Sequence, residues 1–166
     1  MVEQWARILL AVPGSRLLLK ACQLGDDAAR QRLAGRYEKY GVTADRLVLE
    51  GATPGRAEHL AAYHRVDIGL DPFPYNGVTT TMEALWMGVP VVTVAGDRWS
   101  GRMSRTILDA VGLEDWVARD LGAYIEMAVA AAGDLAVLAL LRETLRDRVE
   151  QSRFCDGPAF TRDLEA

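Results

Sequence analysis

Residues 66–94 read VDIGLDPFPYNGVTTTMEALWMGVPVVTV, and this stretch decides the fold class. A short apolar run at 66–70 is followed by a loop, by a helical pattern at 80–87 and by a β-branched run at 89–94. A strand, a helix and a second strand in this order are typical of a βαβ unit with parallel strands. The nearly continuous apolar run at 91–94 predicts a strand that helices cover on both faces.

The same alternation extends over the rest of the chain. Further strands are expected at residues 16–20, 46–50 and 115–117, and further helices at 2–12, 26–40, 56–65, 101–111, 123–148 (one or two helices) and 156–166. We therefore predict an α/β fold, with a doubly wound parallel sheet, in a single domain over residues 1–166. The first helix has no Ser, Thr or Asp cap before it, which indicates a fragment of a longer protein.

Composition excludes several classes of function. The 166 residues carry a formal net charge of -4, which argues against a nucleic-acid partner. No run of about eighteen apolar residues is present, so we expect no membrane partner. Two cysteines, Cys22 and Cys155, cannot form a disulfide framework, and we expect a cytoplasmic protein.

The loop at 71–79 is the first candidate site, because ligands of doubly wound sheets bind beyond the carboxyl ends of the strands. Gly77 would let a ligand approach the backbone, or would supply a positive φ. Thr79 and Thr80 then open a helix, whose N–H groups and dipole attract an anion such as a phosphate. The alternative needs no ligand: Thr80 and Glu83 have the spacing of a capping box.

A second candidate loop follows the strand at 46–50. Arg56 and His59 are expected near the same edge of the sheet, although taken alone they fit a solvated arginine and a half-buried histidine packing on Leu60 better than a ligand site. His59 and His64 lie roughly 140° apart around their helix, so they cannot share a metal ion. The chain has no Asp-x-Asp pair, no phosphate-binding P-loop motif and no dinucleotide glycine motif, and we predict no metal and no cofactor.

Residues 66–98 closely resemble the C-terminal catalytic lobe of the protein O-GlcNAc transferase and SPINDLY family, especially its bacterial members with tetratricopeptide repeats. The resemblance runs through nearly the whole chain. It implies the Rossmann-like C-terminal half of a GT-B glycosyltransferase, which holds most of the sugar nucleotide. Such enzymes are metal-independent, inverting transferases that move a sugar onto Ser or Thr hydroxyls of proteins.

The resemblance also implies roles for particular residues. Thr79 and Thr80 match threonines that hold the diphosphate, and Glu83 matches an acidic position that bonds the ribose. His59 matches a histidine stacked near the base. Arg56 matches a basic residue that contacts the nucleotide, and Pro54 falls where the loop backbone reads the base edge. Two positions depart from the animal members, which have a histidine at Val78 and an arginine at Ala62.

The implied donor is UDP-GlcNAc or another nucleotide sugar, and the implied acceptor is a protein bound through the missing lobe and repeats. Family members use UDP-GlcNAc or GDP-fucose, so both bases stay open. The catalytic base is expected in the missing lobe, so that this chain holds no catalytic residue and is inactive alone. Two alternatives remain: a non-catalytic module that binds a nucleotide sugar, and a GT-B transferase with a lipid or glycan acceptor.

Overall fold

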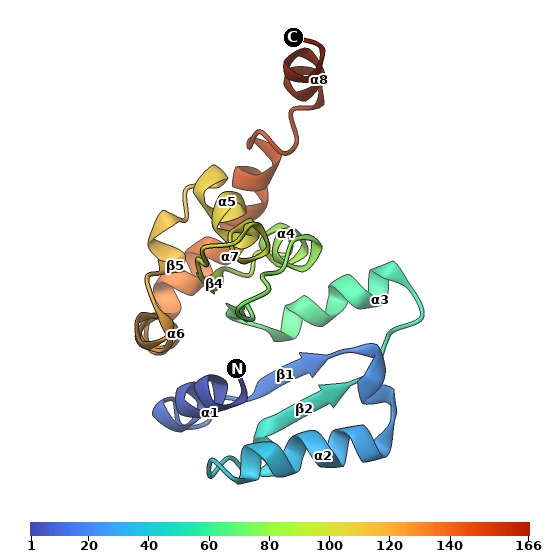
Figure 1. Ribbon diagram of the computed structural model, residues 1–166, viewed down its shortest axis with the longest axis vertical. Helices are drawn as coiled ribbons and strands as arrows, with labels where there is room; N and C mark the ends of the chain where they lie inside the picture. The colour runs from blue at the N-terminus through green and yellow to red at the C-terminus, as the bar shows by residue number, and fades with distance from the viewer. The chain divides into compact units, whose positions relative to one another are not determined.

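The computed structural model describes residues 1–166, which form two compact units, Met1–Val66 and Asp67–Ala166. Both units combine helices with parallel strands, which confirms the predicted α/β class (Figure 1). The prediction of one domain over the whole chain stays a prediction.

The first unit holds a two-stranded parallel sheet. Strands β1 (Leu17–Lys20) and β2 (Leu47–Glu50) pair in a register that sets Lys20 opposite Glu50. Because the strands are parallel, both carboxyl ends lie at one edge of the sheet. The helices of this unit are α1 (Val2–Ala11), α2 (Asp27–Glu38) and α3 (Arg56–Ala61).

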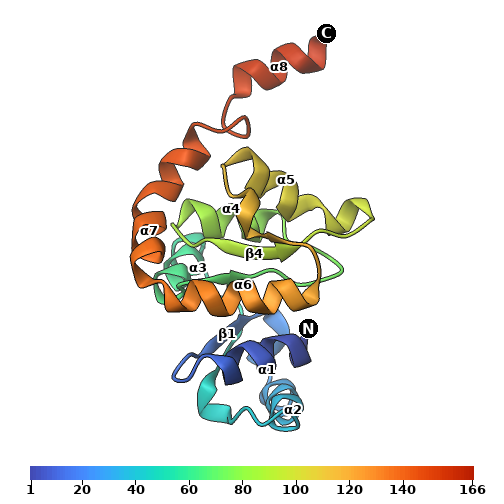
Figure 2. The same ribbon diagram turned by 90° about the vertical axis from the view of Figure 1, so that its left-hand side faces the viewer.

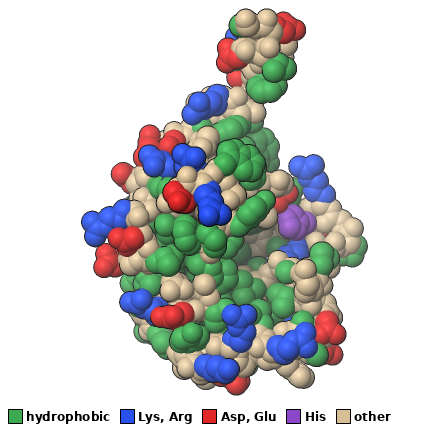
Figure 3. All heavy atoms as spheres, viewed as in Figure 1, with side chains coloured by type: hydrophobic (Ala, Val, Ile, Leu, Met, Phe, Trp, Pro, Cys, Tyr) green, Lys and Arg blue, Asp and Glu red, His purple; other side chains and the backbone are tan.

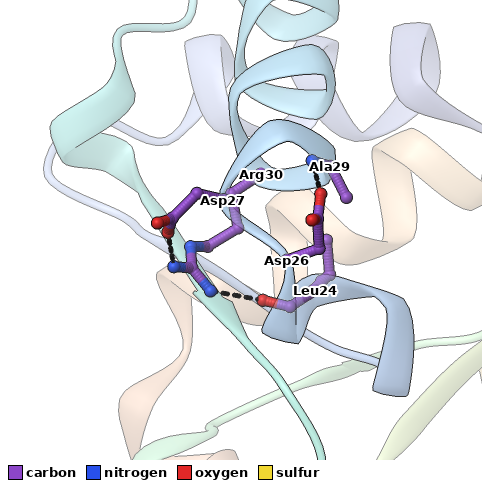
Figure 4. A network of polar contacts seen from close by, with 5 residues as sticks. All are labelled: Leu24, Asp26, Asp27, Ala29 and Arg30. Atoms are coloured by element: carbon purple, nitrogen blue, oxygen red, sulfur yellow. Dashed lines mark hydrogen bonds and ion pairs between the residues drawn. The ribbon is translucent and has the colours of Figure 1, made fainter.

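The start of α2 is capped by its own side chains. The Oδ1 atom of Asp26 accepts a 2.7 Å hydrogen bond from the backbone N–H of Ala29, one of the first-turn N–H groups that lack a helical acceptor. Arg30 pairs with Asp27 and donates a 2.6 Å hydrogen bond to the carbonyl of Leu24 (Figure 4). This helix start therefore has a side-chain cap.

The second unit is built around β4 (Val91–Val94), the central strand of a parallel sheet of order β3-β4-β5. Strands β3 (Gly69–Leu70) and β5 (Val117–Ala118) each pair with one half of β4. The helices are α4 (Thr79–Trp86), α5 (Met103–Ala110), α6 (Leu121–Gly133), α7 (Leu135–Glu150) and α8 (Gly157–Glu165). All four residues of β4 are buried, and Figure 2 shows α5 and α6 on opposite sides of it. The predicted covering of both faces is confirmed.

Some predicted boundaries differ from those in the structure. Strand β3 covers only Gly69–Leu70 of the predicted 66–70, and a 3-10 turn (Ala62–Arg65) forms the end of the predicted helix 56–65. The stretch 123–148, where one or two helices were expected, contains two, since Asp134 ends α6 and caps α7 by accepting a 3.0 Å hydrogen bond from the N–H of Val137. The threonine helix begins at Thr79 rather than at residue 80.

The face drawn in Figure 3 carries Lys and Arg side chains interspersed with Asp and Glu, and hydrophobic side chains cover much of the area between them. Helix α8 has no buried residue, and Figure 2 shows it standing apart from the helices around β4. Taken singly, each helix falls short of the length and apolar composition of a membrane span. Only α6 and α7 as a pair, bent by 93° at their junction, reach both.

Candidate functional site

The turn between β3 and α4 leaves the start of α4 without a side-chain cap. Val78 occupies the N-cap position and makes no capping hydrogen bond, and the first bond of the helix runs from the N–H of Met82 to the carbonyl of Val78 at 3.0 Å. Thr79 and Thr80 are exposed on the first turn, whereas Thr81 is buried. The positive end of the helix dipole therefore meets solvent beside two hydroxyl groups, which is the chemistry of an anion site.

The capping-box alternative was wrong. A capping box needs its Ser or Thr at the N-cap position, where the side chain accepts from the third residue of the helix. Thr80 is instead the second residue of α4, inside the first turn, and Val78 stands at the N-cap. The pattern from Thr80 to Glu83 thus has the spacing of a capping box without its geometry.

Gly77 is required by crowding and not by backbone strain. The positive φ that we considered was wrong, because the only glycines with positive φ are Gly14, Gly41, Gly88 and Gly112. A Cβ on Gly77 would lie 2.5 Å from the hydroxyl oxygen of Thr80 and 2.8 Å from that of Thr81. The turn therefore folds tightly against the threonines, and only a residue without a side chain fits there.

Asp71 anchors this turn through hydrogen bonds. It follows β3 directly, is 5% exposed, and its Oδ1 accepts a 2.7 Å hydrogen bond from the N–H of Gly77. Its Oδ2 accepts a 2.6 Å hydrogen bond from the hydroxyl of Thr93 in β4. Burial raises the pKa of the Asp71 carboxyl, and the hydrogen bonds from Thr93 and Gly77 oppose that shift. Our sequence analysis missed Asp71, although an acidic residue directly after a buried strand was a usable signal.

A second loop is tied to the same turn. The N–H of Asn76 donates to the carbonyl of Ser100 at 2.9 Å, and the N–H of Gly96 donates to the carbonyl of Gly101 at 2.6 Å. The loop at 95–102 thus borders the turn at 72–77. Trp99 within it is 71% exposed, so it does not pack as a lid over the turn.

A separate cavity of about 600 Å³ lies at the carboxyl ends of β4 and β5. None of the predicted site residues lines it, and its walls mix basic and acidic side chains. Its lining residues are Ala95, Arg105, Asp109, Glu114, Val117, Ala118 and Arg119. We place the candidate site at the start of α4 instead, because the uncapped helix and the threonine hydroxyls supply a specific chemistry that this cavity lacks.

Glu83 lies one turn into α4 and is half-buried. It is four residues after Thr79, so the two side chains share a face of the helix. This position suits a carboxylate that accepts hydrogen bonds from hydroxyl groups of a ligand whose anionic part sits at the helix start. Gly77, Thr79, Thr80 and Glu83 are thus brought together at one loop–helix junction of the second unit.

The remaining predicted residues form a set in the first unit. Pro54 and Arg56 are exposed in the loop and at the first position of α3, and His59 is half-buried one turn later. The ring of His59 contacts Tyr63 edge-on, with centroids 6.1 Å apart. The three residues therefore share one loop–helix junction, directly after β2.

Lys20 joins this set and was missed by our sequence analysis. It is the last residue of β1, and its Nζ lies 3.0 Å from the hydroxyl of Thr53 and 3.2 Å from Nδ1 of His59. Beside it, Arg65 makes two hydrogen bonds of 2.7 and 2.8 Å to the carboxylate of Glu50, which lower the pKa of that carboxyl. The position of Lys20 at the carboxyl end of a strand was the available signal.

The acidic, histidine and cysteine side chains form no group of three or more that could hold a metal ion. Both cysteines, Cys22 and Cys155, are exposed and free. The two junctions carry hydroxyl, backbone N–H, ammonium, guanidinium and imidazole donors beside the Glu83 carboxylate. Donors of this kind bind phosphate groups.

Comparison with known proteins identifies the family. The sequence matches glycosyl transferase family 41 over residues 1–164. The chain belongs to this family. This confirms the resemblance to the O-GlcNAc transferase and SPINDLY proteins that the threonine loop indicated.

Curated relatives of this chain are much longer than the chain itself. A probable UDP-N-acetylglucosamine–peptide N-acetylglucosaminyltransferase SPINDLY of Petunia hybrida is 42% identical over 165 residues, which are 99% of this chain and 18% of the relative. The UDP-N-acetylglucosamine–peptide N-acetylglucosaminyltransferase of Caenorhabditis elegans is 29% identical over 165 residues, 14% of its length. The chain thus spans less than a fifth of these relatives.

A solved structure shares the fold. A mutant of the Thermobaculum terrenum O-GlcNAc transferase matches with a TM-score of 0.91 and 42% sequence identity, over 99% of this chain and 31% of that chain. The match confirms the predicted fold class, the Rossmann-like C-terminal half of a GT-B glycosyltransferase.

Proposed function

We propose that this chain is the nucleotide-sugar-binding lobe of a glycosyltransferase that moves a GlcNAc-like sugar onto Ser or Thr hydroxyls of proteins. The single observation that carries the proposal is the uncapped start of α4, where Thr79 and Thr80 are exposed beside the helix dipole. The names of the relatives support a UDP-GlcNAc donor and a peptide acceptor.

The diphosphate of the donor binds at the first turn of α4, to the Thr79 and Thr80 hydroxyls and to backbone N–H groups, with Gly77 allowing close approach. Glu83 accepts hydrogen bonds from the ribose hydroxyls. Arg56 and His59 contact the nucleotide, with His59 stacked near the base and the backbone at Pro54 reading its edge. These assignments follow the family resemblance and the two junctions described above.

The reaction is a direct displacement that inverts the anomeric carbon. The acceptor oxygen forms a bond to that carbon as the bond to the diphosphate oxygen breaks, and the acceptor proton passes to a base in a part of the protein outside this chain. The α4 dipole and its N–H groups stabilise the charge that develops on the leaving diphosphate. We propose that no metal takes part, because these donors fill its role and the sequence lacks an Asp-x-Asp pair.

The setting follows from the same proposal. The partners are a nucleotide sugar and a protein acceptor, which binds through other parts of the longer protein, and neither nucleic acid nor membrane is a partner. Free, exposed Cys22 and Cys155 favour the reducing cytoplasm. This chain alone binds a nucleoside diphosphate weakly and transfers nothing.

Calorimetry with UDP and with GDP tests the proposal. We expect the wild-type chain to bind one of the two, and the double variant Thr79→Ala/Thr80→Ala to bind it at least about tenfold more weakly, since two hydrogen bonds to a charged group are lost. Thr144→Ala, at a half-buried threonine on α7 outside the proposed site, is the control and should bind as the wild type does. No binding by the wild type, or equal binding by the wild type and the double variant, would refute the proposed site.

A further inference from the structure

Asp71 is a buried acid in a place where folding alone would favour a neutral residue. It is 5% exposed, and its burial raises the pKa of the carboxyl, so that ionised Asp71 is costly to bury. No cationic side chain is hydrogen-bonded to it. Its two oxygens instead accept from the Gly77 N–H at 2.7 Å and from the Thr93 hydroxyl at 2.6 Å. Side-chain hydrogen bonds from Ser104 and Asn76 also reach the carboxyl, and the Gly77 N–H is its one backbone donor in the threonine turn.

Gly77 is held from its other side as well. Its carbonyl accepts a 3.0 Å hydrogen bond from the hydroxyl of Ser104 on α5, which is fully buried. The same hydroxyl lies 2.8 Å from that of Thr81 on α4. Asp71 thus fixes the N–H of Gly77, and Ser104 fixes its carbonyl. A Cβ on Gly77 would lie 3.2 Å from Asp71 Oδ1.

This arrangement determines where the first turn of α4 begins. Gly77 comes two residues before Thr79, so a rotation of its peptide would move the threonine hydroxyls and the N–H groups beside them. Hydrogen-bond donors stabilise an anion well only when they are held in place before it binds. A change of about 1 Å in a positioning group is enough to weaken such a site markedly.

We propose that Asp71 is a positioning residue of the diphosphate site: its carboxylate holds the Gly77 amide inward and so presents Thr79, Thr80 and the start of α4 to the diphosphate. Asp71 does not touch the ligand. The inference rests on the proposed function, and it adds to the family pattern a residue that acts through the turn.

UDP or GDP binding, whichever the wild-type chain shows, tests this role by calorimetry on three variants. Asp71→Ala removes the acceptor, and affinity should fall about tenfold, the equivalent of one misplaced hydrogen-bonding group. Asp71→Asn keeps an acceptor of the same shape for Gly77 and should restore binding to within about threefold of the wild type. Val149→Ala, which opens a cavity in the core near the end of α7, should lower thermal stability without lowering affinity.

Backbone amide exchange measured by NMR gives a readout independent of the ligand. The Gly77 amide should exchange slowly in the wild type and in Asp71→Asn, and rapidly in Asp71→Ala. Asp71→Leu fills the same space without an acceptor and serves if Asp71→Ala does not fold.

Two results would overturn the positioning role while leaving the proposed function intact: wild-type affinity in a folded Asp71→Ala or Asp71→Leu, or equal losses in Asp71→Asn and Asp71→Ala. A wild-type chain that binds neither UDP nor GDP would instead refute the proposed function, and the positioning role with it.

Discussion

The ammonium nitrogen of Lys20 lies 3.2 Å from Nδ1 of His59 and so joins the end of β1 to α3. A lysine ammonium can only donate hydrogen bonds, so Nδ1 accepts and the proton of the neutral ring resides on Nε2. The hydroxyl of Thr53, 3.0 Å from the same ammonium, accepts a second bond. Lys20 therefore sets both the orientation of the His59 ring and the edge on which it carries a donor.

Lys20→Met keeps the length of the side chain and removes the donor. We expect the Nε2–H tautomer of His59 to lose its dominance in ring nitrogen NMR spectra, and UDP or GDP affinity to fall about threefold to tenfold. Lys39→Met is the matched control, because Lys39 is the only other lysine and is exposed. An unchanged tautomer in Lys20→Met would contradict the role assigned to the ammonium group.

Gly77 and Gly35 offer a matched pair for the same substitution. Gly77→Ala would place a Cβ 2.5 Å from Thr80 Oγ1, and we expect a loss of about 1–3 kcal/mol in the free energy of unfolding together with weaker nucleotide binding. Gly35 lies inside α2 with nothing within 4 Å of its added Cβ. Gly35→Ala should therefore stabilise the chain by about 0.5–1 kcal/mol. Urea denaturation measures both, and a neutral Gly77→Ala would show that the turn yields to the methyl group.

Much of the fold follows from local pattern in the sequence. The run 91–94 predicted a buried central strand, and β4 occupies those residues, because apolar residues on both faces suit a strand between helices. Helix ends were less predictable. The break at Asp134 depends on one capping hydrogen bond. The end of α3 depends on a 3-10 turn, whose amino-acid composition does not differ from that of an α-helix.

The site was predictable where a loop has a distinctive composition. Gly77, Thr79 and Thr80 stand out as a glycine and hydroxyl run before a helix, and the structure shows that helix uncapped. Lys20 and Asp71 were missed because each is a single charged residue at the end of an apolar strand. The partner of Lys20, His59, is 39 residues away, and the partner of Asp71, Gly77, is 6 residues away. Only the folded structure brings each pair together.

Metal independence makes a direct prediction for nucleotide binding. If the donors at the start of α4 carry the diphosphate, excess EDTA should leave the affinity for UDP or GDP within about twofold of its value in Mg²⁺. Binding should instead weaken as salt concentration rises, because the contacts are charge-assisted. Calorimetry in paired buffers measures both effects. A loss of binding in EDTA that Mg²⁺ restores would show that a metal bridges the diphosphate.

Tyr37 predicts a pH dependence of stability that is separate from the site. Its ring is fully buried, its hydroxyl has no hydrogen-bond partner, and burial raises the pKa of the phenol from 10.0 to about 12. The folded chain therefore holds this proton more tightly than the unfolded chain does. The stability due to Tyr37 is fully present below pH 10, and it is lost as the pH rises through 10 toward 12.

Tyr37→Phe removes both the unsatisfied hydroxyl and the titration. At neutral pH we expect Tyr37→Phe to be as stable as the wild type or more stable by about 1 kcal/mol, since a buried group without a partner is lost. Between pH 10 and pH 11 the wild type should lose about 1 kcal/mol relative to Tyr37→Phe. Tyr40→Phe, at an exposed position three residues later, should follow the wild type throughout. Parallel stability curves for wild type and Tyr37→Phe in urea would mean that the Tyr37 hydroxyl reaches water or a partner in the folded chain.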